Sequence, residues 1–98
     1  MIATVGIWLV REGREEEFVR RWQEVADGTV LEYADVTFRL LRDRENPRRF
    51  VGLGEGWRSA EQVEALRASP RYQDSMSSLW RLLESGELGT FELVAEVS

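Results

Sequence analysis

The chain has 98 residues, of which 43% are hydrophobic and 32% are charged, and its formal net charge is −5 at pH 7. This length suits one domain with one core, which we expect to span residues 1–98. The acidic charge disfavours nucleic acid and anionic membrane surfaces as partners, and no apolar run approaches the roughly 18 residues of a membrane-spanning helix. Because no basic segment precedes the first apolar stretch, as it would in a signal peptide, we expect a cytoplasmic protein.

Three residue types are missing from the chain. Cys and His do not occur, and all 13 basic residues are Arg, so Lys is absent as well. These absences exclude disulfides, thiolate nucleophiles, Cys/His zinc sites, Ser-His triads, lysine Schiff bases and His-ligated haem. We expect no metal and no cofactor. Any catalysis must use Asp, Glu, Tyr, Ser, Arg, Trp, backbone amides or the substrate itself.

The first half of the chain predicts two strands with a helix between them. Residues 2–10 are β-branched and apolar, as in a strand. The helix has three Glu residues in its first turn, where its dipole favours anions, and we expect it to end at Gly28. Its apolar stripe consists of Phe18, Trp22, Val25 and Ala26. A loop with Tyr33 follows, and the alternation over residues 36–43 predicts a strand with Phe38 on its apolar face.

Residues 49–57, which read RFVGLGEGW, predict the third strand. Every second position in its second half is glycine: Gly52, Gly54 and Gly56. Successive strand side chains point to opposite faces, so this spacing predicts a bare face, with Glu55 and Trp57 opposite it and towards the helices. We expect Trp8 to lie across the bare glycines and a partner subunit to close over them. A groove for a ligand is the alternative.

The second half of the chain predicts a broken helix and a last strand. Ser59 and Gln62 fit a capping box, and that helix is expected to run to about Ala68. Ser69 and Pro70 then predict the start of a new helical segment, which is expected to end at Gly86. Residues 89–97 alternate as a final strand.

The predicted order is β-α-β-β-α-β, which is typical of the ferredoxin-like α+β arrangement. In that fold an antiparallel sheet carries both helices on one face. The other face is left uncovered, yet it carries apolar residues, and such a surface usually binds a partner. We therefore expect a homodimer formed through the sheet face.

Four segments together resemble the antibiotic biosynthesis monooxygenase (ABM) family of dimeric α+β barrels. They read GREEEFVRRWQE after the first strand, LLRDRENPRRF at the hairpin, GEGWRSAEQVEALRASPRY into the second helix, and FELVAEV at the end. The resemblance covers nearly the whole chain and implies two subunits that pair sheet to sheet, each with a cleft between sheet and helices. It also implies one of the family's activities, which include cofactor-free oxidation of aromatic polyketides, quinol oxygenation and haem degradation.

Haem degradation is disfavoured by two departures from that branch of the family. The branch has an Asn on the first strand, where this chain has Gly6, Ile7 and Trp8. It also has a His on the second helix, where this chain has Arg67 and Arg71. The family feature that carries over is the Trp at the end of the third strand, Trp57.

Glu55 and Trp57 are the leading candidates for catalysis. A carboxylate between Leu53 and Trp57 would be partly desolvated, which favours its protonated form and suits a general base near neutral pH. An ion pair with Arg39 or Arg58 is the alternative. A buried indole N–H needs a partner, and the resemblance implies a substrate oxygen for Trp57, with ordinary core packing as the alternative.

The second helix supplies the other candidates. Its aromatic and Met stripe usually indicates core, but Tyr72 follows the break at Pro70 and would reach the mouth of a cleft. Arg67 would bind an anionic group there or remain solvated. The expected substrate-binding residues are Phe38, Leu53, Met76, Trp80 and Arg67.

These candidates lead to one functional hypothesis and one alternative. The hypothesis is a cofactor-independent monooxygenase of an aromatic or quinol-type small molecule, with Glu55 as base and Trp57 and Tyr72 orienting substrate oxygens. The substrate anion would reduce O₂ itself inside a dry cleft. The alternative is a non-catalytic dimer that binds a small ligand or serves a structural role, because fold determines activity poorly. A cleft that is packed shut would favour the alternative.

Overall fold

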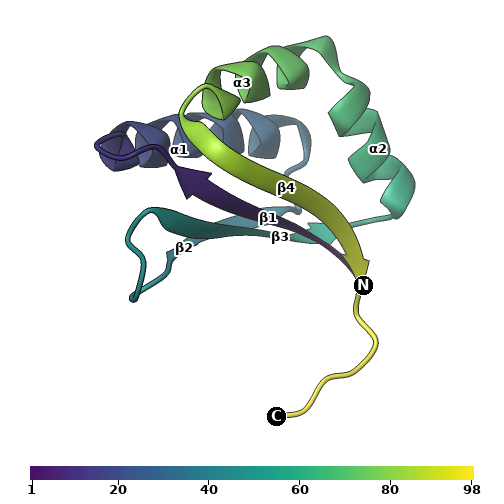
Figure 1. Cartoon of the computed structure of the whole chain (residues 1–98). Coiled ribbons are helices and arrows are strands. Elements are labelled where there is room, and N and C mark those ends of the chain that lie inside the picture. The colour runs from purple at the N-terminus through teal and green to yellow at the C-terminus, as the bar shows by residue number, and fades with distance from the viewer.

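The computed structural model describes residues 1–98 and contains a four-stranded sheet with three helices on one of its faces (Figure 1). The elements in chain order are β1 (Ile2–Val10), α1 (Glu15–Glu32), β2 (Thr37–Arg42), β3 (Arg49–Trp57), α2 (Ala60–Ala68), α3 (Pro70–Trp80) and β4 (Leu83–Glu92). The strands pair antiparallel in the order β2-β3-β1-β4. The predicted ferredoxin-like fold is confirmed, with its second helix divided into α2 and α3. No helix combines the length and the apolar character that crossing a membrane requires.

The break between α2 and α3 follows from the capping residues predicted there. The Ser59 side chain accepts a hydrogen bond from the Gln62 N–H at 3.2 Å, and Gln62 Oε1 accepts one from the Arg58 N–H at 2.8 Å. Ser69 ends α2 in an extended conformation, and its hydroxyl accepts from the Tyr72 N–H at the start of α3. Pro70 has no N–H to leave unpaired in this first turn. Tyr72 is thereby placed in the first turn of α3.

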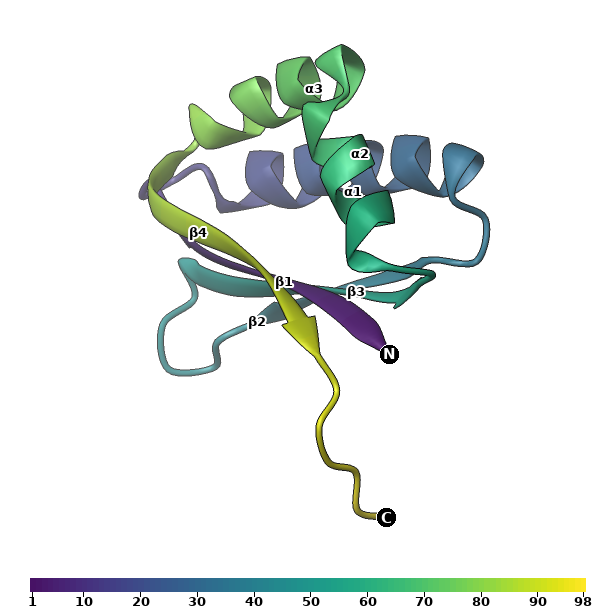
Figure 2. The same cartoon turned by 90° about the vertical axis from the view of Figure 1, so that its right-hand side faces the viewer.

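Two predicted helix ends are wrong, and both fall on glycine. Helix α1 passes through Gly28 and ends at Glu32, where the buried Thr29 donates its hydroxyl proton to the Val25 carbonyl at 2.9 Å. Helix α3 ends at Trp80, and Gly86 lies inside β4. The last strand therefore spans 83–92 rather than 89–97. The residues after it leave the sheet as an extended tail (Figures 1 and 2).

The core lies between the sheet and the helices and consists of two clusters. The larger one centres on Trp8, Phe18 and Phe50, with the Trp8 and Phe18 rings edge to face at 5.5 Å. The smaller one contains Val36, Trp57, Val63 and Leu66. Tyr72 packs against both clusters, so α3 joins the two parts of the core.

The glycines of β3 lie beneath this core. A Cβ atom added at Gly52 would come within 2.6 Å of the Trp8 ring, and Cβ atoms at Gly6 and Gly86 would also meet that ring. Trp8 therefore covers bare backbone, as predicted. The expectation that this face meets a partner subunit is wrong, because Trp8 is 4% exposed and packs under the helices.

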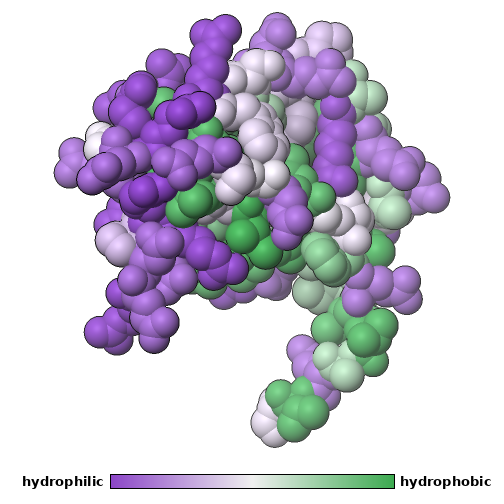
Figure 3. All heavy atoms as spheres, in the orientation of Figure 1, coloured by the Kyte–Doolittle hydropathy of each residue, from purple (hydrophilic) through white to green (hydrophobic).

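The opposite face of the sheet, which we call the open face, is covered by no other part of the chain. Residues of β1 and β3 whose side chains alternate with the core positions are partly exposed there: Val5, Ile7, Leu9, Val51 and Leu53. Leu41 and Phe91 extend this surface and are 51% and 55% exposed. Hydrophobic residues continue along the C-terminal tail (Figure 3), where Val94 and Val97 are 88% and 97% exposed.

Candidate functional site

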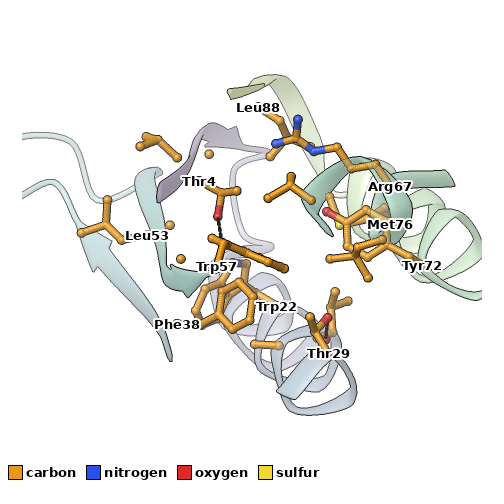
Figure 4. Close-up of a pocket in the computed structure, with 18 of the residues that line it drawn as sticks. Thr4, Trp22, Thr29, Phe38, Leu53, Trp57, Arg67, Tyr72, Met76 and Leu88 are labelled. Atoms are coloured by element: carbon orange, nitrogen blue, oxygen red, sulfur yellow. Dashed lines mark hydrogen bonds between the residues drawn. The ribbon is translucent and has the colours of Figure 1, made fainter. Parts of the chain in front are cut away.

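An apolar cavity lies between the helices and the face of the sheet that they cover (Figure 4). Its empty space is about 560 Å³, part of which is solvent at the open mouth. Thirteen of the 19 residues that line it are hydrophobic, and all seven helices and strands contribute at least one of them. A concave, mostly apolar site with a few polar groups is the usual form of a small-molecule pocket.

The glycines of β3 form part of the cavity floor. A Cβ atom at Gly54 would overlap the Thr4 hydroxyl and come within 2.9 Å of the Phe38 ring. Gly52 leaves room for Trp8 and comes close to Trp22 of α1. The bare face predicted from the alternating glycines is therefore filled from β1, β2 and α1 of the same chain.

Trp57 lies on this same face because β3 contains a bulge. Ile2 of β1 pairs with Trp57, and the next residue, Ala3, pairs with Glu55, so Gly56 has no partner in β1. This extra residue has a φ of +95°. A bulge of this kind shifts the alternation by one residue and favours glycine at a positive φ. Trp57 consequently faces the helices at 6% exposure.

Trp57 is held by aromatic rings and by one hydrogen bond. Its ring packs edge to face on Phe38 at 5.9 Å and lies 5.7 Å from the ring of Tyr33. Its Nε1–H donates to Thr4 Oγ1 at 3.2 Å (Figure 4). The N–H for which a substrate partner was predicted therefore has a partner within the chain.

The position predicted for Glu55 is wrong. Because of the bulge, Glu55 and Trp57 point to opposite faces, and Glu55 lies on the open face, outside the cavity. Its carboxylate accepts from Arg39 Nη2 at 2.8 Å, and its side chain is 39% exposed. The alternative stated for this residue, an ion pair with Arg39, is the arrangement found.

Tyr72 and Arg67 lie on the helix side of the cavity, across from Thr4 (Figure 4). Burial raises the pKa of the Tyr72 hydroxyl above its usual range, and the positive charge of Arg67 offsets part of that effect. Tyr72 is therefore neutral at physiological pH and able to donate a hydrogen bond. The Arg67 guanidinium donates to Thr90 Oγ1 on β4 at 2.9 Å.

The structure brings together most of the predicted site residues. Those that line the cavity are Phe38, Leu53, Trp57, Arg67, Tyr72 and Met76. The Leu53 side chain points away from the cavity, so this residue lines it through its backbone (Figure 4). Glu55 and Trp80 do not line it. Trp80 is the last residue of α3, where its ring lies over Gly86 and is 38% exposed.

Sequence reasoning did not identify 13 of the 19 cavity residues as site residues, among them Thr4, Trp22, Thr29 and Leu88. A signal for Thr4 was available, because it is the one polar residue of a nine-residue apolar strand and shares a face with Gly6 and Trp8. Trp22 belonged to the predicted apolar stripe of the first helix. Thr29 and Leu88 were hidden by the two misplaced glycine boundaries.

A sequence comparison identifies the family, and the segment that it matches contains most of the cavity residues. The family model described as antibiotic biosynthesis monooxygenase matches residues 1–77. The chain belongs to the ABM family. The matched segment contains every cavity residue except Leu88, so the site lies within the part that defines the family.

Several solved structures have the same fold. SnoaB, a cofactor-independent oxygenase from Streptomyces nogalater, aligns with a TM-score of 0.81 at 21% identity over 98% of this chain and 95% of SnoaB. A conserved protein from Methanosarcina mazei Go1 aligns with a TM-score of 0.80 at 19% identity over 92% of this chain and 89% of its own. An antibiotic biosynthesis monooxygenase aligns with a TM-score of 0.80 at 14% identity over 97% of this chain and 100% of its own. No curated protein matches the chain in sequence. At these identities the likeness establishes the fold.

Proposed function

We propose that this ABM protein is a cofactor-independent monooxygenase of a planar aromatic, quinol-like molecule. The observation that carries the proposal is the open apolar cavity, which is walled by the rings of Trp22, Phe38 and Trp57 and has few polar groups. Aromatic walls favour a flat ring system, and the scarcity of polar atoms keeps water away from a reactive anion. Family membership and the likeness to SnoaB, a cofactor-independent oxygenase, support an oxygenase role.

The chemistry needs only the substrate and O₂. With an anthrone, for example, loss of a proton gives an electron-rich anion that reacts with O₂. The CH₂ group becomes C=O, one oxygen atom enters the product and the other leaves as water, so the substrate supplies all the electrons. In this scheme Tyr72 donates a hydrogen bond to a substrate oxygen, and the charge of Arg67 stabilises the anion.

Proton removal is assigned to solvent at the cavity mouth, since no Asp, Glu or His lines the cavity. The nearby positive charge of Arg67 favours ionisation of a bound phenol or anthrone. Glu55 has no part in this scheme, because its carboxylate is on the open face with Arg39.

The same observation favours a second candidate, a non-catalytic protein that binds an aromatic ligand. A cavity without a carboxylate or imidazole has no protein group that is a strong base near neutral pH. The two candidates share the ligand class and differ in turnover.

The test is oxygen uptake by the purified protein with anthrones and hydroquinones and no added cofactor. We expect uptake above the rate without protein, and a reduction of about tenfold in Tyr72→Phe, since one donor to the anion is lost. Tyr33→Phe is the matched control, because Tyr33 does not line the cavity. Binding without uptake for every compound would favour the second candidate.

We also propose that two copies pair through the open face of the sheet. That face is apolar over β1 and β3 and continues into the exposed Phe91 and the C-terminal tail. Leu53→Arg places a charge in this surface, and we expect light scattering to show the mass of one chain instead of two. Leu31→Arg, at an 84% exposed position of α1, should leave the mass unchanged. One-chain mass for the wild type would contradict the proposal.

A further inference from the structure

Thr4 supplies the one hydroxyl on the sheet side of the cavity. It lies on β1, between the apolar residues of that strand, and its side chain points to the helix side. Gly54 on the neighbouring strand leaves the space that Thr4 Oγ1 occupies, because a Cβ atom there would overlap it. The floor is therefore shaped to hold this hydroxyl.

The hydrogen bond with Trp57 determines how that hydroxyl is used. An indole nitrogen only donates, whereas a hydroxyl has one proton to donate and two lone pairs to accept with. The 3.2 Å contact from Trp57 Nε1 therefore takes a lone pair of Thr4 Oγ1 and leaves its proton free. No protein group accepts that proton in the structure.

Two aromatic side chains lie beside the Thr4 hydroxyl. A Cβ atom built at Gly54 would meet both Thr4 Oγ1 and the Phe38 ring, and the Trp57 indole donates to the hydroxyl. The backbone groups of Thr4 itself pair with β3 and β4 through the sheet. Thr4 is partly buried and lines the cavity, so a ligand that brings an acceptor atom to its free proton gains a hydrogen bond.

We propose that Thr4 is a substrate-binding residue that donates a hydrogen bond to an acceptor oxygen, a carbonyl or phenolate, of the aromatic substrate. The Trp57 N–H fixes the position of the hydroxyl, and Gly54 leaves room for it. This inference rests on the proposed function, because it assumes that the cavity binds an aromatic molecule. It adds that the ligand carries an acceptor oxygen at the β1–β3 side, opposite Tyr72.

The experiment compares two ligands of similar size in isothermal titration calorimetry. 1,4-Naphthoquinone has two acceptor oxygens and no donor, and naphthalene has neither. The chain has no Cys and no Lys, the side chains that most readily add to a quinone. The proteins are the wild type, Thr4→Val and Thr4→Ala, which lack the hydroxyl, Thr4→Ser, which retains it, and Thr37→Val. Thr37 is an exposed residue at the start of β2 and lies outside the cavity lining, so it is the matched control.

Loss of one ligand hydrogen bond is expected to weaken quinone binding about tenfold in Thr4→Val and Thr4→Ala. Naphthalene binding should be unchanged in both, and Thr4→Ser and Thr37→Val should keep the wild-type affinity for the quinone. The indole N–H resonances of the four Trp residues report whether each variant is folded. Thr4→Ala leaves space rather than adding atoms, so it tests the proposal if Thr4→Val does not fold.

Three results would overturn the inference. If the folded Thr4 variants bind the quinone as the wild type does, or lose both ligands equally, Thr4 makes no specific bond to an acceptor oxygen. If the wild type binds neither compound, the proposed aromatic site is wrong, and the inference about Thr4 is wrong because it depends on that site. The naphthalene titration separates these cases, since it depends on the cavity and not on the hydroxyl.

Discussion

The two faces of the sheet differ in the side chains that the same strands present on each side. On the helix side, β1 presents Thr4 and Trp8, and β3 presents glycines that make room for them. On the open face the intervening residues of these strands form a partly exposed apolar surface beside the Arg39–Glu55 ion pair. On the helix side, glycines in place of larger residues leave room for a cavity with positioned polar atoms. On the open face, the larger side chains form an apolar surface.

The largest effect should come from removing the side chain that covers the glycines. Trp8→Ala is expected to lower the free energy of unfolding by about 3–5 kcal/mol, because the residue is almost fully buried and no other group fills its space. Denaturant unfolding measures this loss. Leu41→Ala, at an open-face position that is 51% exposed, is the contrasting variant and should cost less in dilute solution. Equal losses would mean that the two faces do not differ as described.

A smaller effect should separate two glycines that the sequence does not distinguish. Gly52→Ala is expected to destabilise the fold by about 1–3 kcal/mol, because its Cβ would be 2.6 Å from the Trp8 ring. Gly28→Ala should instead stabilise it by about 0.5–1 kcal/mol, since that position is helical and its Cβ would meet nothing within 4 Å. Thermal unfolding of the two variants gives the signs. A stabilising Gly52→Ala would show that Trp8 does not need the bare backbone.

Tyr72 should make stability depend on pH only in the alkaline range. Burial raises its pKa in the folded state, so below the ordinary Tyr pKa of 10.0 the residue is neutral in both folded and unfolded chains. Above that pH the unfolded chain ionises first, and stability falls as pH rises through the folded pKa. The decline should be shallower in Tyr72→Phe than in the wild type, as measured by unfolding between pH 8 and 11. The same decline in both proteins would contradict the burial of this hydroxyl.

The smallest effect is expected at Glu55. Glu55→Gln removes an exposed ion pair with Arg39, which is typically worth no more than about 1 kcal/mol. Oxygen uptake should be unchanged, because the carboxylate is not in the cavity. Loss of uptake in a folded Glu55→Gln protein would restore the role of general base that the sequence pattern assigned to it.

Local patterns were sufficient for the fold but not for the faces of β3. The apolar periodicities, the caps at Ser59 and Ser69, and the Trp8 ring over glycine could all be predicted, because each depends on nearby residues or on strand alternation. The bulge at Gly56 could not, since it depends on how β3 pairs with β1. That single extra residue put Trp57 into the cavity and Glu55 outside it.

Glycine was also the least predictable residue for helix ends. Gly28 continues a helix whose next residue, Thr29, is buried, and Gly86 lies under Trp8 within a strand. Tertiary packing decides the structure at both glycines, and local sequence patterns do not reveal that packing. The hydrogen bond between Trp57 and Thr4 could not be predicted for the same reason, because the two residues are 53 positions apart in the sequence.

The central claim is that the helix-side cavity, and not the open face, binds an aromatic molecule. The most direct measurement is a titration with 1,4-naphthoquinone, followed by the ¹⁵N–¹H resonances of the four Trp indoles. Trp8, Trp22 and Trp57 line the cavity, whereas Trp80 lies outside it. We expect the first three indole resonances to shift together and saturably while that of Trp80 stays in place. Shifts confined to Trp80 and to the backbone amides of open-face residues such as Val51 would contradict the claim.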